Sequence, residues 1–315
     1  TPARSSRRST TKTMNSTNRM DRGVLLIATG HRQYVQEALD LAISLRLHSP
    51  NLPVALVTDR QTDSQRLNRT FSHVIPYRPD FGEAFSQKLF IDEYSPFSRT
   101  LFLDTDCLVT RSIEFVFEMF ADHSFVIPGR AFTTGTWYGF NITEMMKTLN
   151  VNWIPRMNTG MIYFEVGDAA LRVFSMARDF LRRGRELGVQ EFREGHMPDE
   201  PAFGFAMAAL DVPPVDDKGL TMRHTTGIDG RMTVDVIGGR SRFQKNGRWV
   251  RPAIVHFGRR HKGHVLIREA RRVRLFGEHG FPAWIARPAG SVYGLARLIG
   301  AGPRIWMNEI RTSRT

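Results

Sequence analysis

The stretch LFLDTDCLVT (residues 101–110) is an apolar run interrupted by two carboxylates, Asp104 and Asp106. Its apolar residues predict a buried strand, and side chains two positions apart in a strand point to the same side. In an open α/β sheet, ligands bind at the carboxyl ends of the strands. The stretch therefore predicts an α/β fold in which both carboxylates face one ligand crevice.

Two carboxylates that meet in an apolar wall can hold a hard cation. Oxygen ligands suit Mn²⁺ or Mg²⁺, and either ion in turn suits a diphosphate. The alternative is that one aspartate caps a turn while the other is an ordinary surface residue. Cys107 is the single cysteine of the chain, so it forms no internal disulfide, and we expect it in the core as a small hydrophobe.

The first half of the chain alternates between strand-like and helix-like patterns. Apolar runs predict strands at residues 23–30, 53–59, 99–109 and 124–130. Helical spacing of apolar residues predicts helices at residues 34–49 and 83–95. Continuous apolar strands separated by helices are typical of a parallel sheet that helices cover on both faces.

The second half is less regular. Strands are predicted at 157–166 and 252–258, and helices at 169–187 and 198–210. Asn246-Gly247 between two strand-like segments predicts a tight antiparallel turn. The expected fold class is thus α/β, with a mostly parallel central sheet flanked by helices and a small antiparallel part.

The basic charge of the chain is concentrated at its ends. Of the net charge of +13, residues 1–23 carry +5, residues 259–315 carry +9, and the part between them carries −1. A near-neutral middle argues against nucleic acid as a partner of the fold itself. Residues 1–22 are rich in Ser, Thr and Arg and predict a disordered tail, with a transit segment or a start-site extension as alternatives.

These patterns divide the chain into a tail (1–22), a globular domain (23–264) and a basic amphipathic segment (265–315). No apolar stretch is long enough to cross a bilayer. The last segment mixes Arg with Leu, Ile, Phe and Trp, which favours peripheral contact with an anionic membrane. The alternative is a helix that packs back on the domain. We expect a cytoplasmic protein, in contact with the inner face of a membrane if that segment binds lipid.

A second motif, IVHFGRRHKG (254–263), also ends a buried strand, here at His256, and Lys262 follows six residues later. Taken alone, a histidine at a strand end is commonly a structural residue rather than a metal ligand. Lys262, taken alone, could simply be solvated. Together with the two aspartates they supply two carboxylates, an imidazole and a cation. A departing diphosphate needs such a set, because a metal and a fixed positive charge neutralise its oxygens.

In their order along residues 23–264, these motifs resemble GT-A-fold nucleotide-sugar glycosyltransferases. The resemblance is greatest to the retaining family of glycogenin and the bacterial lipopolysaccharide galactosyltransferases (glycosyltransferase family 8). It implies that Asp104, Asp106 and His256 bind Mn²⁺ or Mg²⁺ and that Asp104 also contacts the donor. It further implies that Lys262 contacts the diphosphate.

The same resemblance assigns the remaining candidates. Lys88 stands sixteen residues before Asp104 and corresponds to a donor-binding lysine. Thr29 and Tyr34, after the first strand, correspond to the segment that holds nucleobase and ribose. Asn158 in MNTG corresponds to a donor contact.

In DEP (199–201), Asp199 and Glu200 correspond to residues that orient the donor sugar, and they are the expected catalytic pair. Read without the resemblance, they are an acidic pair at a helix N-terminus, which the helix dipole favours. The sequence departs from the family in that Glu200 replaces a Gln, Gly258 comes one residue early, and Gly263-His264 replaces Pro-Trp. These departures bear on the exact family and on retention.

The expected function is a metal-dependent hexosyltransferase that moves a sugar, with retention, from a nucleoside-diphosphate sugar. UDP is the expected nucleotide, and a glycan, a lipid-linked glycan or a protein the expected acceptor. One alternative is a sugar nucleotidyltransferase on a similar fold, although the segment after the first strand has only one glycine for a triphosphate loop. The other is a basic protein without enzymatic activity that binds membrane or nucleic acid.

Overall fold

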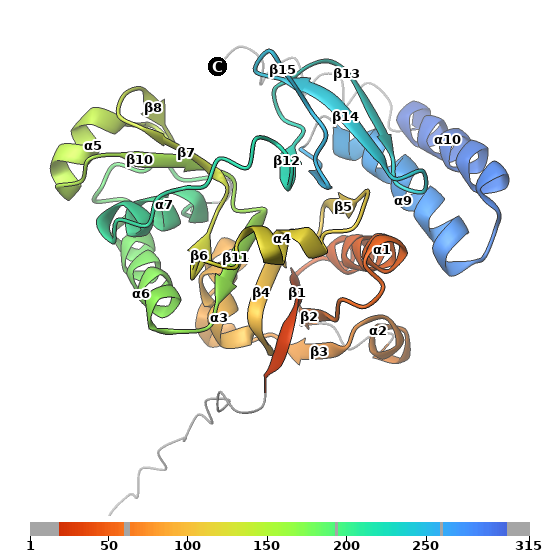
Figure 1. Cartoon of the computed structure of the whole chain (residues 1–315), viewed down its shortest axis with the longest axis horizontal. Coiled ribbons are helices and arrows are strands. Elements are labelled where there is room, and N and C mark those ends of the chain that lie inside the picture. The colour runs from red at the N-terminus through yellow and green to blue at the C-terminus, as the bar shows by residue number, and fades with distance from the viewer. Residues whose placement is uncertain (1–18, 60–63, 193–194, 259–260, 301–315) are drawn as a thin grey trace, which may run out of the picture.

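The computed structural model describes residues 19–59, 64–192, 195–258 and 261–300 (Figure 1). The helices and helical turns are α1 (Arg32–His48), α2 (Ser64–Thr70), η2 (Pro79–Phe81), η3 (Ala84–Phe90), α3 (Ile91–Tyr94), α4 (Glu114–Met119), α5 (Ile142–Leu149), α6 (Asp168–Arg183), α7 (Asp199–Ala209), η5 (Lys262–Leu266), α9 (Ile267–Val273), η6 (Arg274–Glu278) and α10 (Ala283–Gly300). The strands are β1 (Met20–Ala28), β2 (Val54–Thr58), β3 (His73–Pro76), β4 (Phe97–Leu103), β5 (Cys107–Val109), β6 (Phe125–Val126), β7 (Gly129–Phe132), β8 (Thr136–Trp137), β9 (Phe140–Asn141), β10 (Ile154–Met157), β11 (Met161–Glu165), β12 (Met222–His224), β13 (Ile228–Asp235), β14 (Arg240–Lys245), β15 (Arg248–Val250) and β16 (Ile254–His256).

The central sheet has six strands in the order β3-β2-β1-β4-β11-β6. Its first four strands are parallel to one another, whereas β11 runs antiparallel to both β4 and β6. This arrangement confirms the predicted α/β class with a mostly parallel sheet. It also places the carboxyl ends of β1 and β4 side by side at one edge.

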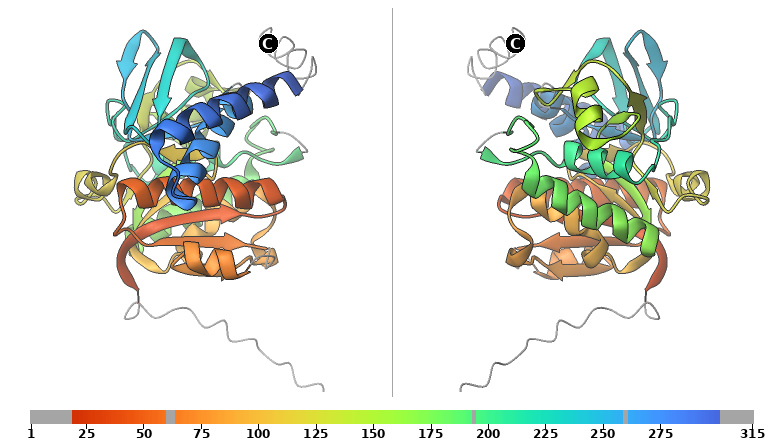
Figure 2. Two further views of the ribbon diagram at one scale, coloured as in Figure 1. Left: turned by 90° about the vertical axis from the view of Figure 1, so that its right-hand side faces the viewer. Right: turned by 90° about the vertical axis from the view of Figure 1, so that its left-hand side faces the viewer.

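Helices cover both faces of the central sheet. Leu26 and Leu101 enter one hydrophobic cluster, together with apolar residues of α1, α2 and α4. Their neighbours Leu25 and Phe102 enter a second cluster with residues of η3, α6 and α7. Views from the two sides accordingly show α1 in front in one and α6 in front in the other (Figure 2). Because both faces are buried, a slip of one residue would exchange the two sets, so the register of the strands is fixed.

The strand predicted at 99–109 is wrong in one respect, because the chain forms two strands there. β4 ends at Leu103, β5 begins at Cys107, and the N–H of Cys107 closes a turn onto the carbonyl of Asp104 (3.1 Å). β5 then pairs with β16 in a second sheet of order β12-β16-β5. Carboxylates are costly to bury inside a continuous strand, so the chain leaves the central sheet where they occur.

The strand predicted at 157–166 is also divided, since β10 ends at Met157 and β11 begins at Met161. The strand predicted at 124–130 likewise becomes β6 and β7. Pro128 lies between them and has no N–H to donate to a ladder.

The helix predicted at 83–95 is a tight 3-10 helix, η3, followed by the short helix α3. The side-chain amide of Gln87 donates to the carbonyls of Arg78 (3.0 Å) and Gly82 (2.5 Å), and the hydroxyl of Tyr94 donates to Gln87 (2.5 Å). These bonds hold the segment folded back on the turn before it, which accounts for the tighter winding.

A three-stranded antiparallel hairpin sheet, β13-β14-β15, follows β12. Asn246 and Gly247 connect β14 to β15 and both have positive φ (51° and 71°). Positive φ at both central residues defines a type I′ turn, so the predicted tight turn is confirmed.

A strand or a helical turn spans each of the two predicted domain boundaries. β1 begins at Met20, within the tail predicted as disordered, and residues 1–18 lie outside the described part. At the other boundary, η5 crosses residue 264, and Val265 and Leu266 are buried with Phe243 of the hairpin. The beginning of the 265–315 segment therefore packs on the domain, and residues 301–315 lie outside the described part.

Candidate active site

The two aspartates lie in the turn where the chain passes from the central sheet to the second sheet. The N–H of Asp104 donates to the carbonyl of Gly160, just before β11 (3.0 Å). The carbonyl of Asp106 accepts from the N–H of Phe257, just after β16 (3.0 Å). The turn is thus held between both sheets. The side chains of Asp104 and Asp106 are 26% and 21% exposed, so both reach solvent from a mostly buried position.

His256, the last residue of β16, points at both carboxylates. Its Nε2 lies 3.1 Å from Oδ1 of Asp106 and 3.8 Å from Oδ2 of Asp104. Burial alone would lower the pKa of His256, but Asp106 and then Asp104 outweigh it and raise the pKa. The predicted set of Asp104, Asp106 and His256 is therefore brought together, although by a turn between two sheets rather than by alternation along one strand.

Asn158 fixes the orientation of the His256 ring. Its side-chain amide donates to Glu200 (2.8 Å), so its carbonyl oxygen faces Nδ1 of His256 (2.8 Å). That oxygen can only accept, and Nδ1 must carry the proton. The remaining nitrogen, Nε2, is then the one presented to the carboxylates. Gly160 is needed beside this pair, because a Cβ there would lie 2.4 Å from Nδ1 of His256.

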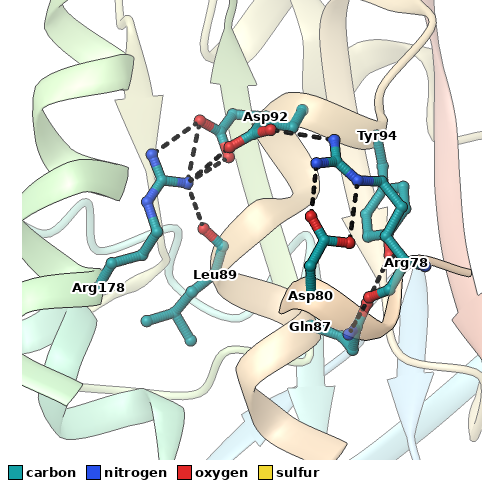
Figure 3. Close-up of polar contacts among 8 residues, drawn as sticks. Arg78, Asp80, Gln87, Leu89, Asp92, Tyr94 and Arg178 are labelled. Atoms are coloured by element: carbon teal, nitrogen blue, oxygen red, sulfur yellow. Dashed lines mark hydrogen bonds and ion pairs between the residues drawn. The ribbon is translucent and has the colours of Figure 1, made fainter. Parts of the chain in front are cut away.

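Lys88 is the cation of the site. Its Nζ lies 3.0 Å from Asp104 and 3.1 Å from Asp199, and its side chain is 10% exposed. Burial alone would lower the pKa of Lys88, but the two carboxylates reverse this and raise it. Lys88 therefore stays charged. The segment that carries it is held against α6 by Arg178, which donates to Asp92 (3.0 Å) and to the carbonyl of Leu89 (2.9 Å) (Figure 3).

Asp199 and Glu200 begin α7 and face the site. Asp199 is buried and accepts from Thr159 (2.7 Å) in addition to its contact with Lys88. Glu200 accepts from Asn158 and from the hydroxyl of Tyr138 (2.9 Å). Burial and the neighbouring Asp199 raise the pKa of Glu200 to about 7. Both predicted residues thus join the network that contains His256.

The residues present fit a divalent cation. One oxygen of Asp106, Sγ of Cys107 and one nitrogen of His256 lie within 4.8 Å of one another. Cys107 is fully buried, as predicted, and its Sγ lies 3.9 Å from the carbonyl of Gly160. Asp104 is outside this group of three, but its Oδ2 lies 3.8 Å from Nε2 of His256. Two carboxylate oxygens and the imidazole nitrogen of His256, which Asn158 orients toward them, are a donor set for Mn²⁺ or Mg²⁺.

The other predicted residues lie at the same edge or outside the described side chains. Thr29 follows β1, and Tyr34, 44% exposed, lies in the first turn of α1. Because β1 is parallel to β4, this edge is the one at which Asp104 lies. Lys262 begins η5, and its side chain is outside the described part.

The sequence analysis missed three members of this network: Tyr138, Thr159 and Gly160. Tyr138 has positive φ (43°) in a Gly-rich loop, and a long-range bond from such a loop leaves no periodic signal. Thr159 and Gly160 belong to the MNTG motif, so the motif had marked their position without giving their roles.

Comparisons with known proteins find likeness in structure only. Neither a family model nor a curated protein sequence matches this chain. The galactosyltransferase LgtC, solved in complex with donor and acceptor sugar analogs, matches over 84% of this chain and 99% of its own, with 12% identity and a TM-score of 0.53.

The WbbM bifunctional glycosyltransferase matches over 67% of this chain and 41% of its own, with 14% identity and a TM-score of 0.47. The glycosyltransferase GlyE of Streptococcus pneumoniae matches over 62% and 45%, with 16% identity and a TM-score of 0.42. This chain therefore spans less than half the length of WbbM and GlyE. The fold shared with LgtC confirms the predicted resemblance to GT-A glycosyltransferases.

Proposed function

We propose that this protein is a glycosyltransferase that uses a nucleoside-diphosphate sugar and a divalent cation. The observation that carries the proposal is the convergence of Asp104, Asp106 and Nε2 of His256 at the carboxyl end of β4, with Lys88 beside them. Ligands of α/β sheets bind at this end. A nucleotide diphosphate requires this combination of cation ligands and a fixed positive charge.

Asp104, Asp106 and His256 would hold Mn²⁺ or Mg²⁺. The ion would supply positive charge to the diphosphate as it leaves. Asn158 keeps Nε2 of His256 directed at the ion site by holding the proton on Nδ1. Lys88 keeps Asp104 and Asp199 in place, and Lys262 would contact the diphosphate.

The donor sugar would lie against Asp199 and Glu200, and the nucleoside against Thr29 and Tyr34. Asp199 is held by Lys88 and Thr159, so it is a fixed acceptor for a sugar hydroxyl. Glu200, with its pKa raised to about 7, can hold a proton near neutral pH. We propose UDP as the nucleotide, transfer with retention, and a glycan, a lipid-linked glycan or a protein as the acceptor.

We also propose that α10 contacts an anionic membrane. A single stripe of this helix exposes Trp284, Val292, Leu295 and Ile299, at 76%, 69%, 58% and 72%. Its opposite side packs closely on α9, because a Cβ at Gly290 would lie 2.3 Å from Arg272. An apolar stripe within a strongly basic segment suits an anionic lipid surface. Within the described ranges, no helix is both long enough and apolar enough to cross a membrane.

Calorimetric titration with a panel of nucleoside diphosphates, in Mn²⁺ or in EDTA, tests the donor and metal site. We expect UDP to bind the wild type only with Mn²⁺, and Asp106→Asn to weaken this binding at least about tenfold, because a charged metal ligand is lost. Asp179→Asn, which changes an exposed carboxylate on α6, should bind like the wild type. Failure of every nucleotide to bind, or binding that ignores both EDTA and Asp106, would refute the proposal.

A further inference from the structure

Lys245, the last residue of β14, is a partly buried cation that the proposed chemistry does not use. Its Nζ donates to the carbonyl of His224 (2.8 Å) and contacts Nε2 of the same residue (2.9 Å). The hairpin thus places an ammonium group against the end of β12.

The backbone register places Lys245 next to the metal site. β12 and β16 are parallel, and His224 is the pairing partner of His256. Paired residues of neighbouring strands are about 5 Å apart and point to the same face. His224, and with it Lys245, therefore lies on the face where His256 meets Asp106.

The charge on Lys245 is not compensated by a carboxylate. Among the described residues, no carboxylate lies within 4.0 Å of its Nζ. The nearby Arg223 is already paired with the buried Asp217 (2.5 Å). Lys88 and Arg178, the cations that hold the active site, each have carboxylate partners. Lys245 differs from these two cations because no described carboxylate lies within that distance of it.

His224 holds Lys245 and leaves part of it available. Nε2 of His224 lies 2.9 Å from Nζ of Lys245, and an unprotonated imidazole nitrogen at this distance accepts a hydrogen bond from the ammonium group. An ammonium group has three N–H donors, and the two contacts with His224 use two of them. The third can bind a ligand.

We propose that Lys245, positioned by His224, binds a phosphate group beside the metal site. An ammonium that is partly desolvated and has no carboxylate is costly, and a phosphate oxygen would offset that cost through a charge-assisted hydrogen bond. The inference rests on the proposed function, because that function brings phosphate to this face. The phosphate has two sources, the donor diphosphate or a phosphoryl group on the acceptor.

Calorimetry with UDP·Mn²⁺ and with inorganic phosphate tests Lys245→Gln against the wild type. Lys147→Gln removes an exposed lysine of α5 and is the matched control. If the donor supplies the phosphate, UDP affinity falls about tenfold or more in Lys245→Gln and is unchanged in Lys147→Gln. If the acceptor supplies it, UDP affinity is unchanged, and inorganic phosphate binds the UDP·Mn²⁺ complexes of the wild type and the control but not that of Lys245→Gln.

Unchanged binding of both UDP and phosphate to Lys245→Gln would overturn the inference. A wild type that binds no nucleotide would refute the proposed function instead. In that case, phosphate binding that depends on Lys245 would still support the proposed phosphate site. Lys245→Met gives an independent check on folding. It should melt no lower than the wild type without phosphate, because an uncompensated charge is removed, and a clearly lower melting temperature would show that Lys245 is structural.

Discussion

Asn158 shows what a single residue contributes to this site. The sequence predicts it as a donor contact, and the structure places it between His256 and Glu200. It thereby links the proposed metal ligands to the acidic pair at the start of α7. Only the fold brings these three residues together, because they lie 98 and 42 positions apart along the chain.

Glu200 gives a prediction about pH. Burial and Asp199 raise its pKa from 4.5 to about 7, so the folded protein binds this proton more tightly than the unfolded chain. Its contribution to stability is therefore complete below about pH 4.5 and is lost as the pH rises through 7. Glu200→Gln removes this dependence. We expect the variant to gain about 1–3 kcal/mol on the wild type between pH 5 and pH 8.

Urea unfolding in EDTA at both pH values measures this difference. The other titrating groups are common to both proteins, so the difference between them isolates Glu200. Glu186→Gln, at a residue whose side chain is 76% exposed, is the control and should follow the wild type. Equal changes in Glu200→Gln and the wild type would contradict the prediction.

At the scale of elements, η3 and α3 form a clamped segment that delivers Lys88. Arg178 on α6 holds Asp92, whose side chain is 2% exposed, and the carbonyl of Leu89 next to Lys88 (Figure 3). We expect Arg178→Met to lower the free energy of unfolding by about 3–5 kcal/mol, because it leaves a buried carboxylate unpaired. The variant should also weaken UDP·Mn²⁺ binding, since Lys88 would lose its support.

Urea unfolding checks the first effect and calorimetry the second. Arg182→Met lies on the same helix in an exposed pair with Asp179, and such a pair contributes at most about 1 kcal/mol. The double variant Asp92→Asn with Arg178→Met should recover part of the loss. A cost for Arg178→Met as small as that for Arg182→Met would show that the clamp is not needed.

The elements also show where prediction from sequence stops. The apolar runs predicted β1, β2, β4 and β16 because buried strands are apolar. They did not predict that 99–109 and 157–166 each divide into two strands, since an apolar run resumes after each break. The polar residues Asp104 to Asp106 and Asn158 mark those breaks. The same polar residues form the candidate site. They therefore account both for the breaks in the predicted strands and for the predicted function.

At the scale of the molecule, the order of the motifs predicted the fold. The individual signals were weak, but parallel pairing of β1 with β4 places Thr29 and Asp104 at the same edge of the sheet. The sequence did not show that η5, which spans the predicted boundary at 264, packs with α9 into the same core as the hairpin. Packing between distant segments cannot be seen in local composition, and for the same reason the sequence did not single out Lys245.

The exposed stripe of α10 gives a prediction for the whole molecule. We expect the protein to co-sediment with vesicles that contain anionic phospholipid at low salt, and less so at high salt. Ile299→Glu places a charge in the stripe and should weaken this binding about tenfold or more. Leu171→Glu changes an exposed leucine on α6 (41%) and is the control. Equal sedimentation of Ile299→Glu and the wild type would exclude α10 as the contact.

The break between β4 and β5 has a consequence for how the molecule holds together. β4 of the central sheet ends at Leu103, and the turn after it carries Asp104 and Asp106. His256 ends β16 of the second sheet and pairs with Cys107, which follows that turn. A cation bound by all three would act as a cross-link between the two sheets. At a concentration one hundred times its dissociation constant it would add about 2.7 kcal/mol to the stability of the folded state. Metal supply would then govern the lifetime of the folded protein as well as its turnover.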